Sequence, residues 1–161
     1  MSLKHNVSSN WYGGNNLQQQ ARINECLDWY QTNLRRSSTS LMQGLFLPLM
    51  FKEDINKPQY LALAEEGRKS LPANLSIMET CLLRDNKFLC GNEVSIADLI
   101  CASELLQISV TGIKIDEHPK LIDWLERVRQ HVKSFDTVHK IFYVVAAKQK
   151  QTPYIKAPSK L

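Results

Sequence analysis

The segment from Ser95 to Ile108 restricts the fold of this chain more than any other. If the segment is helical, it is apolar on nearly every side, and it includes small residues such as Ala97 and Ala102. A helix that is apolar all round lies at the centre of a protein. The segment therefore predicts a buried central helix that other helices approach closely.

The start of this predicted helix carries a capping signal. Ser95 is placed to accept a hydrogen bond from the Asp98 backbone N–H, and the Asp98 carboxylate to accept one from the Ser95 backbone N–H. Such a reciprocal pair is a capping box, and Val94 and Leu99 occupy the two positions of a hydrophobic staple. We interpret Ser95 and Asp98 as structural residues, although a buried carboxylate also resembles a general acid.

Four more segments have apolar residues at helical spacing, which brings the prediction to about five helices. They run over residues 16–47, 57–82, 118–128 and 135–148. No segment shows a convincing strand alternation, and the chain has only six glycines and six prolines, few for a turn-rich β protein. The predicted fold is an all-α, orthogonal bundle.

Individual residues refine this prediction. Proline removes a backbone donor, so we expect Pro48 to end or bend the first helix and Pro72 to kink or divide the second. We expect His118 to cap the fourth helix. The fifth is predicted to turn one apolar stripe inward, made of Val138, Ile141, Phe142 and Val145.

Charge and cysteine content limit the function classes. The formal net charge is +4, from 20 basic and 16 acidic residues, and four of the lysines lie in the last stretch at 148, 150, 156 and 160. We read residues 149–161 as a solvated basic tail, residues 1–10 as a linker remnant and residues 11–148 as the helical domain. The four cysteines show no CxxC spacing, the start shows no signal peptide, and no apolar run could span a bilayer. We therefore expect a cytoplasmic protein with no metal site, nucleic-acid partner or membrane partner.

The first helix has a polar face opposite its core stripe. No histidine pairs with a cysteine or carboxylate at ligand spacing, and the Ser37–Ser38 pair has no GxSxG setting, so we assign no catalytic residue. A solvated helix face alone explains a polar stripe. This stripe consists of Thr32, Arg35, Arg36, Thr39 and Gln43.

Several motifs together resemble the C-terminal domain of the cytosolic glutathione transferases. The stretch Lys87 to Leu99 is similar to the FL-G---SIADL signature that begins the central helix of that family. His118 to Val128 is similar to the next helix of the family. Trp11-Tyr12 and the run Leu27 to Ser37 resemble the linker and long first helix of the theta class.

The resemblance implies a function in two halves. A thioredoxin-like domain, absent from this chain, would bind the co-substrate glutathione and supply the serine that stabilises its thiolate. The present chain would bind the hydrophobic electrophile for detoxification, in a homodimer, and would need no other cofactor. By this resemblance Arg35 would position an anionic group of the substrate, and its neighbours on the polar stripe would line the same pocket.

A second hypothesis comes from a different class. A helical domain of this type without a catalytic partner resembles the scaffold domains that some translation-associated proteins use for assembly. The chain is then a non-catalytic protein-interaction module. Whether an in-frame thioredoxin-like domain lies upstream of Met1 distinguishes the two hypotheses.

Overall fold

The computed structural model describes residues 9–148, which contain helices, turns and loops with one isolated bridge between Phe88 and Gly91. The predicted basic tail and most of the predicted linker lie outside the described residues. The described elements are η1 (Ser9–Tyr12), α2 (Leu17–Thr32), α3 (Leu34–Leu41), η2 (Met42–Phe46), α4 (Leu47–Met50), α5 (Pro58–Ile77), η3 (Met78–Leu83), α6 (Ile96–Ser109), α7 (Pro119–His131) and α8 (Phe135–Lys148). The predicted all-α bundle is confirmed.

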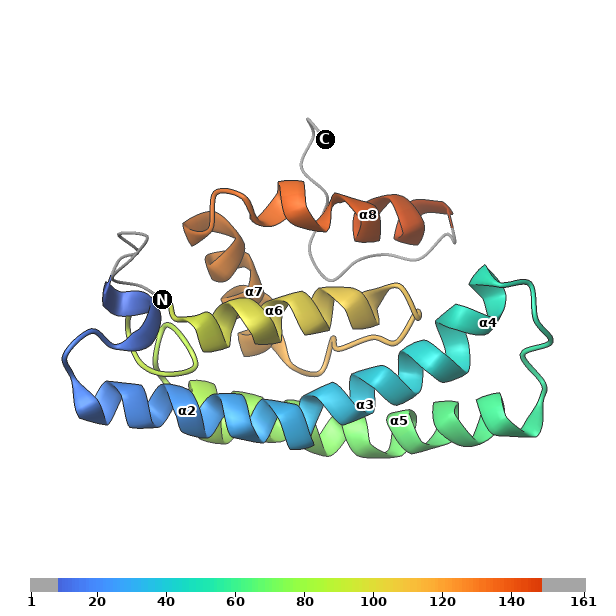
Figure 1. The fold of residues 1–161 in the computed structure, drawn as a ribbon, viewed down its shortest axis with the longest axis horizontal. Coiled ribbons are helices and arrows are strands. Elements are labelled where there is room, and N and C mark those ends of the chain that lie inside the picture. Colours follow the sequence, from blue (N-terminus) through green and yellow to red (C-terminus); the bar gives the residue numbers. More distant parts are fainter. Residues whose placement is uncertain (1–8, 149–161) are drawn as a thin grey trace.

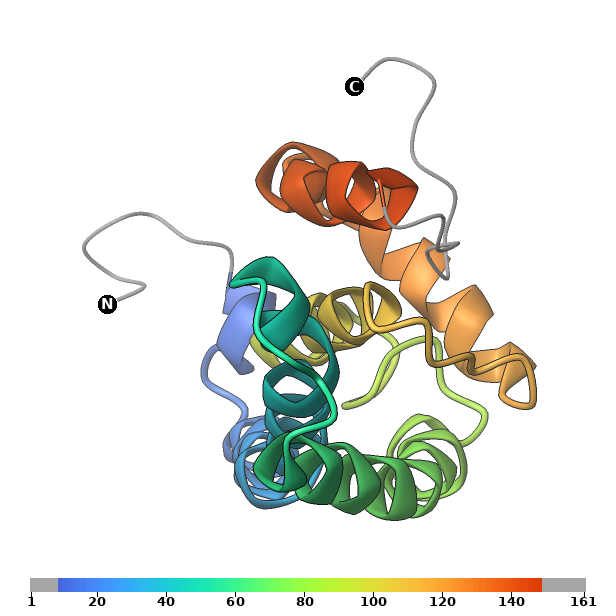
Figure 2. The same ribbon diagram turned by 90° about the vertical axis from the view of Figure 1, so that its right-hand side faces the viewer.

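The bundle is built in layers around α6. The bent rod α2–α3–α4 lies beside α5 along the length of the molecule, and α6 lies between this pair and α8 (Figures 1 and 2). Helix α7 crosses the direction of α6, which makes the bundle orthogonal (Figure 2). Most residues of α6 are buried, as the apolar pattern of 95–108 predicts.

The cap of α6 joins three parts of the chain. Asp98 Oδ2 accepts from the Ser95 backbone N–H at 2.9 Å and from the Ser95 hydroxyl at 2.8 Å, within a complete capping box. Asp98 Oδ1 accepts from the Leu89 N–H at 2.8 Å and from Trp124 Nε1 of α7 at 2.9 Å. Burial raises the pKa of Asp98, and these four hydrogen bonds oppose that shift by stabilising the carboxylate.

The first rod is helical from Leu17 to Met50 with two local faults. At Asn33 the backbone departs from the helix, and the side-chain Nδ2 donates to Trp29 O at 3.0 Å, as a short polar side chain that competes with the helix ladder does. At η2 the turn widens to a π-helix in which the Leu47 N–H bonds Met42 O. Pro48 follows this wide turn and does not end the helix, although the rod turns there (Figure 1).

The structure contradicts part of the prediction for Pro72 in α5. Helix α5 is one continuous helix through Pro72, so a division into two helices is wrong. Pro72 has no backbone N–H to donate to the Arg68 carbonyl, and both residues lie on the exposed side of α5, where solvent can replace the lost donor. Pro58 stands at the first turn of α5, as predicted.

The contact between the first rod and α5 is unusually close. A Cβ added at Gly44 would lie 2.4 Å from the Ala64 backbone nitrogen and 2.7 Å from Tyr60 O. Only glycine therefore permits this approach of η2 to α5.

The predicted inner face of α8 is wrong in part. Val138 and Ile141 are 68% and 60% exposed, whereas His139 and Tyr143 are buried. The polar groups bury because they find partners: His139 Nε2 lies 2.9 Å from Ser103 Oγ of α6, and Tyr143 donates to Asp136 at 2.9 Å. The bond to Ser103 ties this face of α8 to α6, whereas the bond between Tyr143 and Asp136 lies within α8.

We predict that Asp98→Ala lowers the free energy of unfolding by about 3–5 kcal/mol, because it leaves buried donors of the 89–90 loop and of α7 without an acceptor. Ser95→Ala removes only the capping hydroxyl and should cost about 1 kcal/mol. Denaturant unfolding of both variants measures the difference. Equal losses would show that Asp98 serves only as a helix cap.

Candidate functional site

The most notable polar cluster of the described residues is a triad formed by Tyr30, Arg35 and Glu104. Glu104 belongs to the central helix α6 and is 3% exposed. Its Oε2 accepts from the Tyr30 hydroxyl at 2.5 Å and from Arg35 Nη1 at 2.9 Å. A buried carboxylate requires such partners, since desolvation without them is costly.

The triad spans the fault in the first rod. Tyr30 precedes Asn33 and Arg35 follows it, so Glu104 holds both sides of the break against α6. Burial first, and then the bond to Glu104, raise the pKa of Tyr30. The phenol therefore keeps its proton at neutral pH and remains a donor to the carboxylate.

The guanidinium of Arg35 is the accessible end of the triad. The Arg35 side chain is 49% exposed, and its bonds to Glu104 use only Nη1, at 2.9 Å to Oε2 and 3.3 Å to Oε1. The guanidinium also interacts with the Tyr30 hydroxyl. In general, the Nε–Nη2 edge of a guanidinium binds a carboxylate or sulfate through two parallel bonds.

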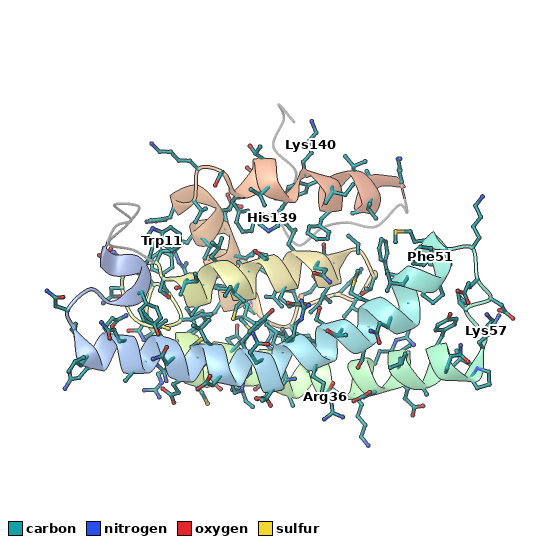
Figure 3. All side chains as sticks on the ribbon, viewed as in Figure 1. Trp11, Arg36, Phe51, Lys57, His139 and Lys140 are labelled. Carbon is teal, nitrogen blue, oxygen red and sulfur yellow. The ribbon has the colours of Figure 1, made fainter. Side chains whose placement is uncertain are left out.

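The polar stripe divides between two sides of the rod. Arg36 turns to α5, where its Nε donates to Glu66 Oε1 at 2.9 Å, and Figure 3 shows it on the side of α3 away from α6. Thr32 and Arg36 line one hollow of about 460 Å³ between the rod and α5. The Thr32 hydroxyl donates to Asp28 O of its own helix at 3.1 Å.

The other two residues of the stripe make no side-chain hydrogen bond within the described range. Thr39 is half-buried and Gln43 is exposed. The structure therefore brings Thr32 and Arg36 together on one side of the rod and places Arg35 on the other, next to α6.

Glu104 and Tyr30 are absent from the sequence-based site. The signal for Glu104 was present, because it is an acidic residue inside a helix that is otherwise almost wholly apolar. Acidic residues are almost never fully buried unless they are paired, so its position demanded a basic partner. Nothing in the sequence indicated which of Arg35 and Arg36 supplies it.

The thiols in the core are not activated. The pKa of Cys26 is raised, first by a hydrogen bond with Cys101 and further by burial. The pKa of Cys90 is raised by its bond with Cys26 and by burial. Raised thiol pKa values and burial are the opposite of what a nucleophilic cysteine requires.

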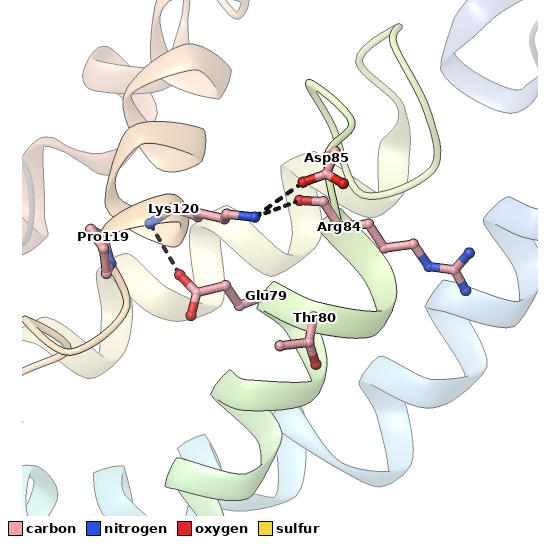
Figure 4. A pocket seen from close by; sticks show the side chains of 6 residues that line it. All are labelled: Glu79, Thr80, Arg84, Asp85, Pro119 and Lys120. Atoms are coloured by element: carbon pink, nitrogen blue, oxygen red, sulfur yellow. Dashed lines mark hydrogen bonds and ion pairs between the residues drawn. The ribbon is translucent and has the colours of Figure 1, made fainter.

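A second hollow, of about 580 Å³, lies where η3 meets the start of α7 (Figure 4). His118 is the N-cap residue of α7, as predicted, but its side chain makes no capping hydrogen bond. Its Nδ1 lies 2.9 Å from Glu79 Oε2, and Glu79 Oε1 accepts the Lys120 N–H at 3.0 Å, so Glu79 of η3 supplies a side-chain acceptor for the first turn of α7. Lys120 also pairs with Asp85, at 3.2 Å. These bonds make the hollow a structural junction.

No group of three or more potential metal ligands occurs within residues 9–148. Over the same range, no helix has both the length and the apolar character needed to cross a membrane.

Comparisons with known proteins agree on one family. A family model described as glutathione S-transferase, C-terminal domain, matches residues 39–131. Glutathione S-transferase T1 of Arabidopsis thaliana is 35% identical over 147 residues, covering 86% of this chain and 58% of the relative. Glutathione S-transferase theta-1 of Mus musculus is 37% identical over 136 residues, covering 82% of this chain and 54% of the relative. The chain thus spans a little over half the length of these relatives.

A solved structure is similar over almost the whole chain. It is a human theta-class glutathione transferase in complex with the glutathione conjugate of 1-menaphthyl sulfate. Its TM-score is 0.74 at 27% identity, over 99% of this chain and 64% of that one.

We predict that Tyr30→Phe lowers the free energy of unfolding by about 1.5–3 kcal/mol, because it removes a buried hydrogen bond to a charged group. Tyr60 also donates to a carboxylate, Glu53, but at the surface, so Tyr60→Phe is a matched control that should leave stability unchanged. Chemical denaturation measures both. A Tyr30→Phe variant as stable as the control would mean that the triad is not formed in solution.

Proposed function

Because the chain belongs to the glutathione S-transferase C-terminal domain family and its relatives are of the theta class, we propose that it forms the electrophile-binding half of a theta-like glutathione transferase. In this proposal a thioredoxin-like domain holds glutathione, and the helical domain receives the hydrophobic electrophile to be conjugated.

The observation that carries the proposal is the geometry of Arg35. A buried carboxylate anchors Nη1 of the guanidinium, and the Arg35 side chain remains half exposed. A guanidinium held in this way suits an oxyanion such as a sulfate or carboxylate on the electrophile or its leaving group. The human theta enzyme that was solved with a conjugate of 1-menaphthyl sulfate suggests a probe of this class.

Exposed apolar side chains at the end of the rod and in the middle of α8 support an apolar ligand. Met50 and Phe51, at the end of α4, are 53% and 65% exposed, and Figure 3 shows Phe51 at that end of the molecule. Ile141 of α8 is 60% exposed. Exposed apolar surface of this kind suits a hydrophobic substrate or the proposed thioredoxin-like domain.

The reacting thiolate is proposed to come from glutathione. Conjugation needs a thiol held near its anionic form, and the pKa values of Cys26 and Cys90 are raised instead. Under this proposal the chain binds and orients the electrophile, acts in detoxification, and works in the cytoplasm as a homodimer.

The alternative is a non-catalytic interaction module, and the apolar end of α4 favours it equally, because such surface also suits a protein partner. The two functions differ in whether Arg35 recognises an anion.

The first experiment titrates the 161-residue chain with 1-menaphthyl sulfate, followed by NMR chemical-shift changes, which detect weak binding. We expect Arg35→Ala to raise the Kd about tenfold or more, because it removes charge-assisted hydrogen bonds to the sulfate. Arg36→Ala removes the same charge one residue away on the α5 side, so it is the matched control and should leave the Kd unchanged. Equal effects of the two variants would support the interaction module.

The second experiment tests the division of labour. The chain alone, with glutathione and a standard electrophile, should give no turnover above the uncatalysed rate, because the proposal assigns the group that stabilises the glutathione thiolate to the other domain. Clear glutathione-dependent turnover would refute the assignment of thiolate activation to the other domain.

A further inference from the structure

The Glu104 carboxylate reduces the positive charge that Arg35 presents to a ligand. Glu104 contacts it directly and is 3% exposed, so water does little to screen the carboxylate from the guanidinium. An anion at the outer edge of Arg35 lies only a few ångströms further from the carboxylate than from the guanidinium. The anion is therefore attracted by the guanidinium and repelled by the carboxylate.

We infer that Glu104 is a specificity-determining residue that weakens anion binding at Arg35 by cancelling part of its charge, so that the site accepts both anionic and uncharged electrophiles. This inference rests on the proposed function, since it concerns the same site.

The bonding pattern supports a role in charge as well as in position. Tyr30 donates a neutral hydrogen bond to Glu104, which stabilises the ionised carboxylate without neutralising it. Of the two side chains bonded to Glu104, only Arg35 carries a charge that compensates the carboxylate. The Arg35–Glu104 ion pair therefore has zero net charge, and its hydrogen-bond donors belong to the half-exposed Arg35.

Such an arrangement has a consequence for turnover. An arginine without a neighbouring carboxylate would hold a sulfate leaving group or an anionic conjugate more tightly and slow its release. An arginine backed by a carboxylate orients the same group through directional hydrogen bonds but binds it less strongly. Uncharged electrophiles then compete for the site on nearly equal terms.

The neighbouring ion pair provides an internal control. Arg36 and Glu66 also form an arginine–glutamate pair, at 2.8 Å, on the opposite side of the rod, but this pair is more exposed to solvent. Removing the charge of Glu66 changes the formal charge of the chain as much as removing that of Glu104, but leaves Arg35 untouched.

The test uses Glu104→Gln, in which the amide oxygen can still accept from Tyr30 and Arg35 while the negative charge is lost. The probes are 1-menaphthyl sulfate and its uncharged counterpart, 1-menaphthyl alcohol. We expect the Kd for the sulfate to fall about fivefold, because a repulsive charge is removed, and the Kd for the alcohol to stay the same. Glu66→Gln should change neither Kd.

An unchanged or higher Kd for the sulfate in Glu104→Gln would overturn the inference. If Arg35→Ala weakens sulfate binding and Glu104→Gln does not strengthen it, the inference fails and the proposed function stands. If Arg35→Ala has no effect, the proposed function itself fails.

A measurement on the unmodified chain covers the case in which Glu104→Gln does not fold. If the pair is effectively neutral, the Kd for the sulfate should change by less than about twofold between roughly 20 and 200 mM salt. A strong salt dependence that Arg35→Ala removes would show that Arg35 acts as a full charge, against the inference.

Discussion

The buried carboxylate of Asp98 is the constraint on which the rest of the bundle depends. Its two oxygens receive donors from the start of α6, from the loop before it and from Trp124 of α7. A single ionised group therefore fixes the direction of the central helix and docks a second helix against it. Because burial alone disfavours this charge, the donors around it must all be in place, and the arrangement tolerates little displacement.

Helix α6 carries two buried acids that serve different purposes. Every bond to Asp98 comes from groups within the fold, so its charge is used internally. Glu104, two turns later, is bonded to one neutral side chain and one half-exposed arginine, so part of its partner remains available to a ligand. The same helix thus provides structural order at its first turn and, in its second half, the carboxylate that holds Arg35, the residue proposed to bind a ligand.

The sequence predicts the elements of this fold better than their orientation. The capping box and the apolar pattern of 95–108 locate α6, because both are local properties of the chain. The face that α8 turns inward is different, since it depends on Ser103 in α6, a residue that no helical pattern within 135–148 can reveal. Pro72 is tolerated for a similar reason: whether the affected carbonyl is exposed depends on packing.

The candidate site shows the same limit at the level of single residues. Arg35 and Arg36 are adjacent and chemically identical, and both belong to one polar stripe in the sequence. Their roles separate only because α6 offers a carboxylate on one side and α5 offers another on the opposite side. A rule that buried acids need basic partners would have identified Glu104, but the choice of partner required the packed helices.

The distribution of the thiols has a practical consequence. Cys26, Cys90 and Cys101 lie in the interior where α2, the loop before α6 and α6 meet, whereas Cys81 on η3 lies at the surface. Among the cysteines of the described residues, a maleimide dye added to the native chain therefore attaches at one place. The other three cysteines would become labelled only when the bundle opens. The rate of this additional labelling therefore measures local unfolding around the central helix.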